Sequence, residues 1–211
     1  MGFSMPRDGR DTRSTIMDAA ESLILAQGFA GSSIEDIIAR AGVTKGTFFY
    51  HFESKAALAY ALVKRFAELD RANLDEKMAR AESLSRDPLQ QFLIFIGLMR
   101  EMMEDLTEPY PGCLYAAYVY ESELFDARTL KVVRNALQGW RDVMAPKIRH
   151  IIEHYPPRRP VDADSLADML TVTFEGAFIV SKVMNEPDLV ADQLDHFRDY
   201  VEFLFAPPER A

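Results

Sequence analysis

The sequence predicts an all-α protein of about nine helices, with a three-helix N-terminal head joined by a long helix to a C-terminal helical bundle. Three observations predict this class. Apolar residues recur at spacings of three and four along most of the chain, which is the helical period. No segment offers the partner strands that a sheet would need. Residues 33–55 combine helix caps and a glycine in the order expected for two short helices joined by a tight turn.

The short-helix pair is predicted from its capping residues. Ser33 is placed to cap the first helix, and Asp36 stands three positions on, close to a capping box. Gly42 supplies the left-handed residue that ends this helix, and Thr44 caps a second helix that runs to about Tyr50. Two short helices across a glycine turn are typical of a helix-turn-helix, whose second helix enters the DNA major groove.

The segments around this pair complete the expected head. Residues 1–11 are predicted to be a flexible tail, whose arginines are either solvated or in contact with DNA. A first helix is expected over residues 12–27, and the head is assigned to residues 12–55. A long helix should then run from residue 53 or 54 to about 81 and bury a stripe of apolar side chains. This stripe comprises Leu58, Leu62, Phe66 and Leu69.

The remaining residues, 56–211, are assigned to a helical domain for ligand binding and dimerisation. Residues 88–106 are apolar almost all round, so this helix should be buried on every side. Residues 113–125 fit a helix or a strand, and the helix is chosen because no strand could pair with them. Pro146 lies inside the next apolar stripe and is expected to kink or break that helix.

Two further helices are expected over residues 162–184 and 189–205. The first of them has two apolar faces, which indicates two packing partners. One face carries Leu166, Leu170, Thr173, Ala177 and Ser181, and the other carries Met169, Val172, Gly176, Ile179 and Val183. We therefore expect a homodimer formed through these last two helices, the alternative being a core within one chain.

The charge is divided unevenly along the chain. The net charge is −9, yet residues 1–65 carry +1 and residues 66–211 carry −10, so only the N-terminal part is suited to approach DNA. The N-terminus has no apolar signal-peptide core, and no apolar run is long enough to span a membrane. A single cysteine allows no disulfide within the chain, so a cytoplasmic protein with no membrane association is expected.

The string GVTKGTFFYHFESKAALAYALV, residues 42–63, closely resembles the TetR family of bacterial regulators. The specific resemblance covers residues 12–66. It implies an all-α homodimer with two helix-turn-helix heads, which binds a pseudo-palindromic operator on double-stranded DNA, and a ligand cavity in each C-terminal body. It also implies that Phe48, Phe49 and Phe52 form the core of the head.

Matched to the family pattern, eight residues are expected at the DNA. They are Ser33, Thr44, Lys45, Gly46, Thr47, Tyr50, His51 and Lys55. Ser33 and Lys55 would hold phosphates, whereas Lys45 would reach either a guanine edge or a phosphate. Because few side chains reach bases, much of the affinity should come from the DNA backbone and fall steeply with salt.

The middle of the chain concentrates aromatic rings and methionines, which can line an adaptable apolar pocket or simply form core. The expected effector is therefore small and apolar or aromatic. The candidate lining residues are Phe95, Met99, Met102, Met103, Tyr115, Tyr118, Trp140, Met144, Phe174 and Phe178.

Two other function classes compete with a regulator. His150, Glu153 and His154 spell H-x-x-E-H, the pattern of one class of zinc peptidase, but a third ligand and a cleft would be needed. The pattern also ends a helix, where histidines interact with the helix dipole. Neither an enzyme, nor a cofactor, nor a metal site is expected, and a helical protein-interaction module is the other alternative. A ligand-released repressor is favoured over an activator because repression is commoner in the resembled family.

Overall fold

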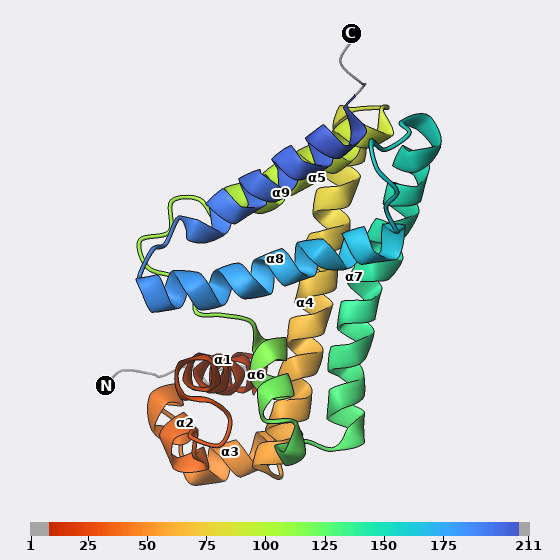
Figure 1. Ribbon diagram of the computed structural model, residues 1–211. Helices are drawn as coiled ribbons and strands as arrows, with labels where there is room; N and C mark the ends of the chain where they lie inside the picture. The colour runs from red at the N-terminus through yellow and green to blue at the C-terminus, as the bar shows by residue number, and fades with distance from the viewer. Residues whose placement is uncertain (1–8, 207–211) are drawn as a thin grey trace, which may run out of the picture. The chain divides into compact units, whose positions relative to one another are not determined.

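The structure is a computed structural model, and it describes residues 9–206. Over this range the chain folds into α-helices with one short 3₁₀ helix and no strand (Figure 1), as the sequence predicted. The elements are α1 Gly9–Gln27, α2 Ile34–Ala41, α3 Lys45–His51, α4 Lys55–Leu84, α5 Pro88–Glu101, α6 Leu114–Tyr120, η1 Ser122–Leu124, α7 Ala127–His154, α8 Ala163–Met184 and α9 Leu189–Phe205. Within the described part of the chain, no helix is both long and apolar enough to cross a membrane.

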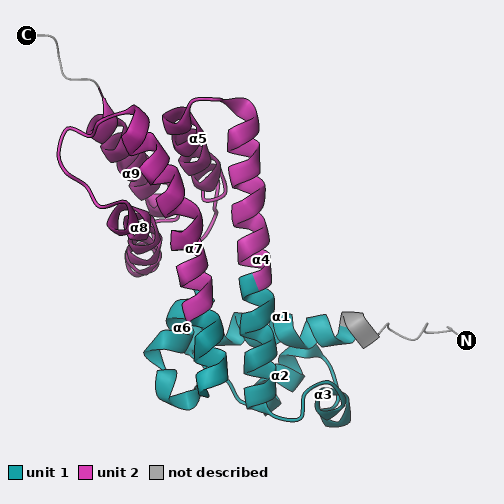
Figure 2. Cartoon of the chain, turned by 90° about the vertical axis from the view of Figure 1, so that its right-hand side faces the viewer, with its two compact units in different colours: residues 1–67, 113–133 teal, residues 68–112, 134–211 magenta. Residues whose placement is uncertain are grey.

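The chain forms two compact units, and neither is continuous in sequence (Figure 2). Unit 1 comprises residues 1–67 and 113–133, and unit 2 comprises residues 68–112 and 134–211. The boundaries fall inside α4 and α7, so each of these long helices contributes to both units. This division differs from the linear division at residue 55 that the sequence suggested.

Unit 1 contains the three predicted head helices together with α6 and η1. Arg65 of α4 forms ion pairs with Asp18 and Glu21 of α1, at 2.6 Å and 2.8 Å. Tyr118 of α6 is fully buried, stacks on Phe125 with ring centroids 4.2 Å apart, and donates its hydroxyl to the Ala59 carbonyl. Burial raises the pKa of this phenol, which therefore stays neutral and able to donate. The head is thus held by a helix that lies about sixty residues beyond it in the chain.

Unit 2 is organised around α5, α8 and α9. Helix α5 begins at Pro88, with Asp87 as its cap, and buries most of its length because its apolar residues surround the axis. Helix α9 buries one stripe of apolar side chains spaced by three and four positions. The buried residues of that stripe are Val190, Leu194, Phe197, Val201 and Leu204.

The two predicted faces of helix α8 differ in burial. The face that includes Leu166, Leu170 and Ala177 is buried in unit 2. The second face is open to solvent in a single chain, with Val172 67% exposed and Val183 77% exposed. Large apolar side chains in a continuous exposed row are unusual on a monomer and mark an interaction surface.

Several expectations need correction. Helix α1 begins at Gly9, three residues before the expected start, and the remainder of the expected flexible tail, residues 1–8, lies outside the described residues. Helix α7 continues through Pro146, because buried neighbours such as Met144 and Ile148 hold its apolar face on both sides of the missing amide donor. Leu69 is 64% exposed and does not belong to the buried stripe of α4.

The expected helices over 88–106 and 113–125 are also shorter than predicted. Helix α5 ends at Glu101, and a turn follows in which Asp105 adopts a positive φ of 61°. Helix α6 ends at Tyr120 and gives way to the 3₁₀ turn η1, because Glu121 leaves helical geometry with φ −117° and ψ 35°. The choice of helix over strand for this segment was correct.

Candidate DNA-binding and effector-binding sites

Helix α2 is fixed at its start by a complete capping box. The Asp36 amide donates to Ser33 Oγ at 3.0 Å, and the Ser33 amide donates to Asp36 Oδ2 at 3.1 Å. The Ser33 hydroxyl also donates to the same carboxylate at 2.5 Å. These bonds stabilise the ionised form and hold the pKa of Asp36 below its ordinary value of 3.8. The predicted cap is therefore present.

The turn and the second helix follow from local residues in the same way. Gly42 takes φ 64°, the left-handed conformation that favours glycine, and its amide donates to the carbonyls that α2 leaves open. Thr44 then caps α3, accepting from the Thr47 amide at 3.1 Å. Phe48 is fully buried beneath α3 and Phe52 nearly so, which sets the side of α3 that faces solvent.

The solvent-facing side of α3 presents the predicted recognition residues. Thr44, Lys45 and Gly46 are exposed, and Tyr50 is 84% exposed, the largest value among the large hydrophobic side chains described. Thr47 and His51 are half-buried beside them. No Cβ clash restricts Gly46, whose nearest outside atom would lie 3.8 Å away, so the backbone here is open to close approach.

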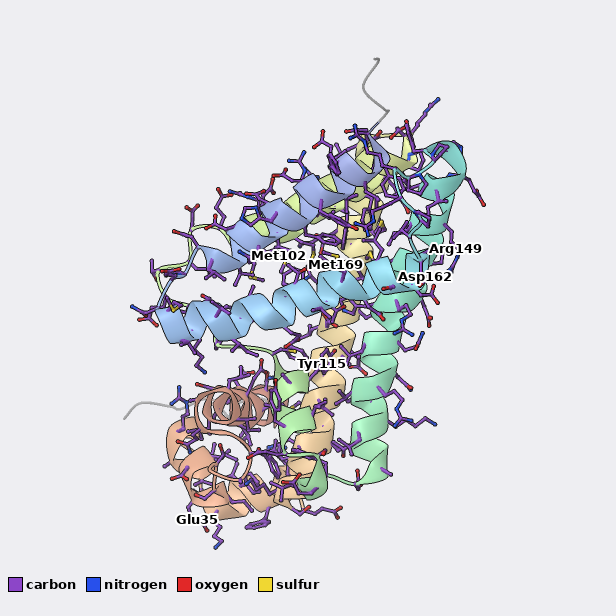
Figure 3. The ribbon with its side chains drawn as sticks, in the orientation of Figure 1. Glu35, Met102, Tyr115, Arg149, Asp162 and Met169 are labelled. Atoms are coloured by element: carbon purple, nitrogen blue, oxygen red, sulfur yellow. The ribbon has the colours of Figure 1, made fainter. Side chains whose placement is uncertain are left out.

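Lys45 pairs with Glu35 of α2 at 3.6 Å, and both side chains are largely exposed (Figure 3 labels Glu35). An exposed pair of this kind contributes little to stability. The ammonium of Lys45 can therefore exchange its carboxylate partner for a DNA group at small cost. Phe49 is 43% exposed and packs its edge on Phe48, so it does not belong to the core of the head as expected.

The two residues expected at phosphates are engaged inside unit 1. The Ser33 hydroxyl is held by Asp36. The Lys55 ammonium donates to the Phe29 carbonyl and lies 4.0 Å from the centroid of the Phe29 ring. Desolvation lowers the pKa of Lys55, and the nearby Glu121 carboxylate opposes that effect.

Glu121 is a structural residue of this site that the sequence analysis missed. Its carboxylate accepts from the Phe29 amide at 2.6 Å and from the Ala30 amide at 3.3 Å. Gly28 has a φ of +79°, and an added Cβ there would lie 2.9 Å from Glu121 Oε1, so the turn and the carboxylate are closely fitted. Glu121 thus joins α6 to the α1–α2 turn, next to Lys55.

The ten candidate effector residues do not all lie in one unit. Tyr115 and Tyr118 belong to unit 1, where Tyr115 meets Phe66 edge-on at 4.9 Å and Tyr118 is bonded to Ala59. The other eight belong to unit 2. Of these, Phe95, Met99, Met103, Met144 and Phe174 are buried in its core.

The three remaining members lie at the margin of that core. Trp140 is half-buried and donates its indole N–H to Asp70 at 2.8 Å. Its ring begins a row of aromatic contacts that continues through Phe174 and Phe178 to Tyr110, with centroid separations of 6.4, 5.9 and 4.8 Å. Met102, labelled in Figure 3, follows the end of α5 and is 39% exposed. Its sulfur accepts from the Asn73 side-chain amide.

The histidine pattern at the end of α7 has the geometry of a surface cluster. His150, Glu153 and His154 are all exposed, with one possible ligand atom from each within 4.8 Å of the others. A hydrolytic zinc centre needs a further ligand and an open position in a shielded cleft. Exposed side chains on one helix do not supply these, and the hydrolase alternative is not supported.

The capped helix pair, the open face of α3 and the all-helical body together define a helix-turn-helix transcriptional regulator. Two family models match the chain. Residues 16–62 match the model for bacterial regulatory proteins of the tetR family, and residues 88–197 match the tetracyclin repressor-like C-terminal domain. Because the second match alone covers more than half of the chain, the protein belongs to the TetR family.

Individual relatives agree with this assignment. The repressor DhaR of Mycobacterium sp. (strain GP1) is 28% identical over 176 residues, which cover 81% of this chain and 82% of DhaR. The regulator LmrA of Bacillus subtilis (strain 168) is 31% identical over 66% of this chain and 72% of its own. A TetR-family regulator from Agrobacterium tumefaciens shares the fold, with a TM-score of 0.74 and 22% identity over 94% of this chain and all of the other.

Proposed function

We propose that this regulator acts in the cytoplasm as a repressor, binding a pseudo-palindromic operator as a homodimer and leaving it when a small apolar or aromatic effector binds. The DNA-binding part of this proposal rests on the exposed side chains of α3. Thr44 caps this helix, and Phe48 is buried on its opposite side. In this proposal Lys45, Thr47 and Tyr50 reach base edges or the adjoining backbone. Gly46 permits close approach, and Thr44 and His51 flank the contact.

Ser33 and Lys55 remain part of the proposed DNA surface in a different way. Both lie at helix starts, where backbone amides attract phosphate. Their side chains are committed to Asp36 and to the Phe29 turn. Their contribution is therefore to hold the amides of α2 and the α1–α2 turn in the position that a phosphate would meet.

The homodimer is proposed from the exposed apolar face of α8. Val172, Ile179 and Val183 are each more than half exposed in the single chain. Gly176 lies among them with no atom near its absent side chain, so a partner helix has room to approach closely. Packing this face against its copy, with α9 beside it, would remove the row from water and place two heads on one operator.

The effector is proposed to meet unit 2 at the row of rings from Trp140 to Phe178. Trp140 and Phe178 are only partly buried, whereas Phe174 between them is buried in the same core as Phe95 and Met99. Partly buried rings and the partly exposed Met102 thioether suit an apolar or aromatic ligand. Tyr115 and Tyr118 remain candidates, although the Tyr118 hydroxyl and the Tyr115 ring already have partners in unit 1.

The function is tested by selecting genomic fragments with the purified full-length protein and measuring its mass in solution. An enriched inverted repeat, bound by a dimer and read through Tyr50, is the expected result. A reporter placed downstream of that repeat should fall when the protein is expressed, and a rise would identify an activator. Recovery of fragments with no shared palindrome would overturn the proposal.

A further inference from the structure

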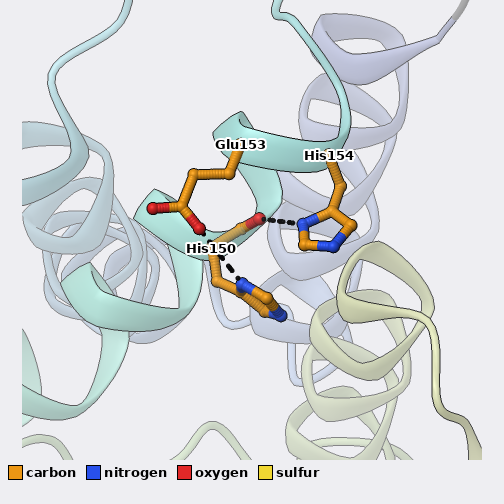
Figure 4. A group of neighbouring side chains, drawn as sticks. All are labelled: His150, Glu153 and His154. Carbon is orange, nitrogen blue, oxygen red and sulfur yellow. Dashed lines mark hydrogen bonds and ion pairs between the residues drawn. The ribbon is translucent and has the colours of Figure 1, made fainter.

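The last turn of α7 carries three side chains of the metal-ligating kind on one face (Figure 4). Residues three and four positions apart are neighbours on a helix surface, which brings His150, Glu153 and His154 together. One possible ligand atom from each lies within 4.8 Å of the others. Among the residues that the structure describes, no other group of three His, Cys, Asp or Glu side chains has this arrangement.

The distances within the group suit a shared ion. His150 Nδ1 lies 3.4 Å from Glu153 Oε2, too long for a good hydrogen bond between them. Two ligands of a tetrahedral zinc ion lie about 3.3 Å apart, given zinc–nitrogen bonds of about 2.0–2.1 Å. His150 and Glu153 therefore already stand at the separation of two ligands of one ion.

The third ligand is oriented by the backbone. His154 Nδ1 lies 2.9 Å from the His150 carbonyl oxygen, and since a carbonyl only accepts, this nitrogen donates. The proton is thereby assigned to Nδ1, and the lone pair of Nε2 is left for a ligand. Metal-bound histidines commonly hold their second ring nitrogen in this way. The two imidazole centroids are 4.4 Å apart, so the rings are direct neighbours on the helix surface.

We propose that His150, Glu153 and His154 bind one divalent transition-metal ion per chain, through His150 Nδ1, a Glu153 carboxylate oxygen and His154 Nε2. Two imidazoles and one carboxylate suit Zn²⁺, Ni²⁺ or Cu²⁺, whereas Mg²⁺ and Ca²⁺ take sets made of oxygen. Because all three side chains are exposed, water completes the coordination. The role is binding, with no chemistry assigned to the ion.

An ion at this place would act on the structure of unit 2. Tyr155 follows the site directly and donates its hydroxyl to Asp87, the residue that caps α5. An ion bound by both His150 and His154 would stabilise the last turn of α7 and, with it, the contact between Tyr155 and Asp87. A ligand that binds only the folded chain stabilises it, by an amount that grows as the free ligand concentration exceeds the dissociation constant, and so raises its unfolding temperature.

The test uses the untagged full-length protein, freed of metal with a chelator and titrated calorimetrically with zinc chloride. We expect one ion per chain, and His150→Ala or His154→Ala should weaken zinc binding at least about tenfold, since even indirect metal contacts give changes of that size. His196→Ala, which removes an exposed histidine of α9, is the matched control and should bind as the parent does. Magnesium chloride should give no saturable binding.

A second measurement separates a specific site from scattered surface binding. Zinc should raise the unfolding temperature of the parent and of His196→Ala, and chelator should reverse the rise, but His154→Ala should show no rise. Circular dichroism of each variant checks its fold, which exposed substitutions should leave intact. Absence of saturable zinc binding would overturn the proposal, and so would equal affinity of the parent and the two histidine variants.

Discussion

The two units of this chain stabilise their helices by different means. In unit 1 the short helices α2, α3 and α6 depend on placed polar bonds, such as those of Ser33 with Asp36 and of Glu121 with the Phe29 turn. In unit 2 the helices are long and depend on a continuous apolar core in which α5 is buried over most of its length. A reader of DNA needs fixed geometry, which polar bonds supply. A body that answers to an effector needs apolar volume, in which related side chains can replace one another.

The test of this difference with the largest expected effect removes one fully buried phenylalanine from each unit. Phe48→Ala and Phe95→Ala should each lower the free energy of unfolding by about 3–5 kcal/mol, because each leaves a cavity in a packed core. Chemical denaturation measures both. Phe48→Ala should also abolish operator binding, whereas Phe95→Ala should retain it in the fraction that remains folded.

Milder variants keep this comparison readable if the alanine variants do not fold. Phe48→Leu and Phe95→Leu should each be less destabilising than the alanine variants. Phe48→Leu should still weaken operator binding, and Phe95→Leu should retain it. If Phe48→Leu bound operator as tightly as the parent while Phe95→Leu did not, α3 would not be the reader.

The next test removes the polar bond that joins α6 to the head. Glu121→Ala should lower the free energy of unfolding by about 1.5–3 kcal/mol, because it leaves the Phe29 and Ala30 amides without a charged acceptor. Glu123→Ala, two positions on and exposed, is the matched control and should change stability little. The same denaturation measurement serves both variants, and equal stability of the two would show that the Glu121 bonds add nothing.

The sequence predicted those parts of the molecule that depend on neighbouring residues. Ser33, Gly42 and Thr44 act within four positions of themselves, so their caps and turn could be predicted from spacing alone. Glu121 and Phe29 are 92 positions apart, and no periodicity indicates that they meet. The same limit explains the effector set. Rings and thioethers indicated an apolar environment, yet the sequence could not show that Tyr115 and Tyr118 pack in unit 1.

Pro146 and the end of α6 show that contacts between residues distant in sequence can override local helix signals. A proline disfavours a helix interior through its missing donor, but burial on both sides of Pro146 outweighs that cost. The end of α6 at Glu121 likewise follows from a tertiary bond, because the carboxylate is drawn to the α1–α2 turn. In both places the deciding interaction comes from residues distant in sequence.

A third test compares two head residues that differ in how they face solvent. Tyr50→Ala should leave stability within about 0.5 kcal/mol of the parent, because the ring is 84% exposed, and should weaken specific operator binding by about 1–3 kcal/mol. Lys55→Ala should also weaken binding, through loss of the Phe29 and Glu121 contacts. Fluorescence anisotropy with operator and with unrelated DNA measures both, and only Tyr50→Ala should alter sequence preference.

The salt dependence separates the two possible roles of Lys55. A lysine that contacts a phosphate directly contributes about 0.9 to the slope of log affinity against log salt. We expect the slope of Lys55→Ala to match that of the parent, because the ammonium is engaged by the Phe29 carbonyl. A shallower slope would assign Lys55 to a phosphate.

The smallest expected effect concerns the cap of α2. Ser33→Ala should lower the free energy of unfolding by about 1 kcal/mol, the usual value of an N-cap side chain. It should also let the pKa of Asp36 rise toward 3.8, since the bonds from Ser33 are what hold it down. Because the folded pKa lies below the unfolded one, the stabilisation from this carboxylate is complete above about pH 3.8 and is lost as the pH falls through the folded pKa. Carboxyl NMR titration of the parent and Ser33→Ala measures the shift, and an unchanged Asp36 titration would mean that the capping box does not persist in solution.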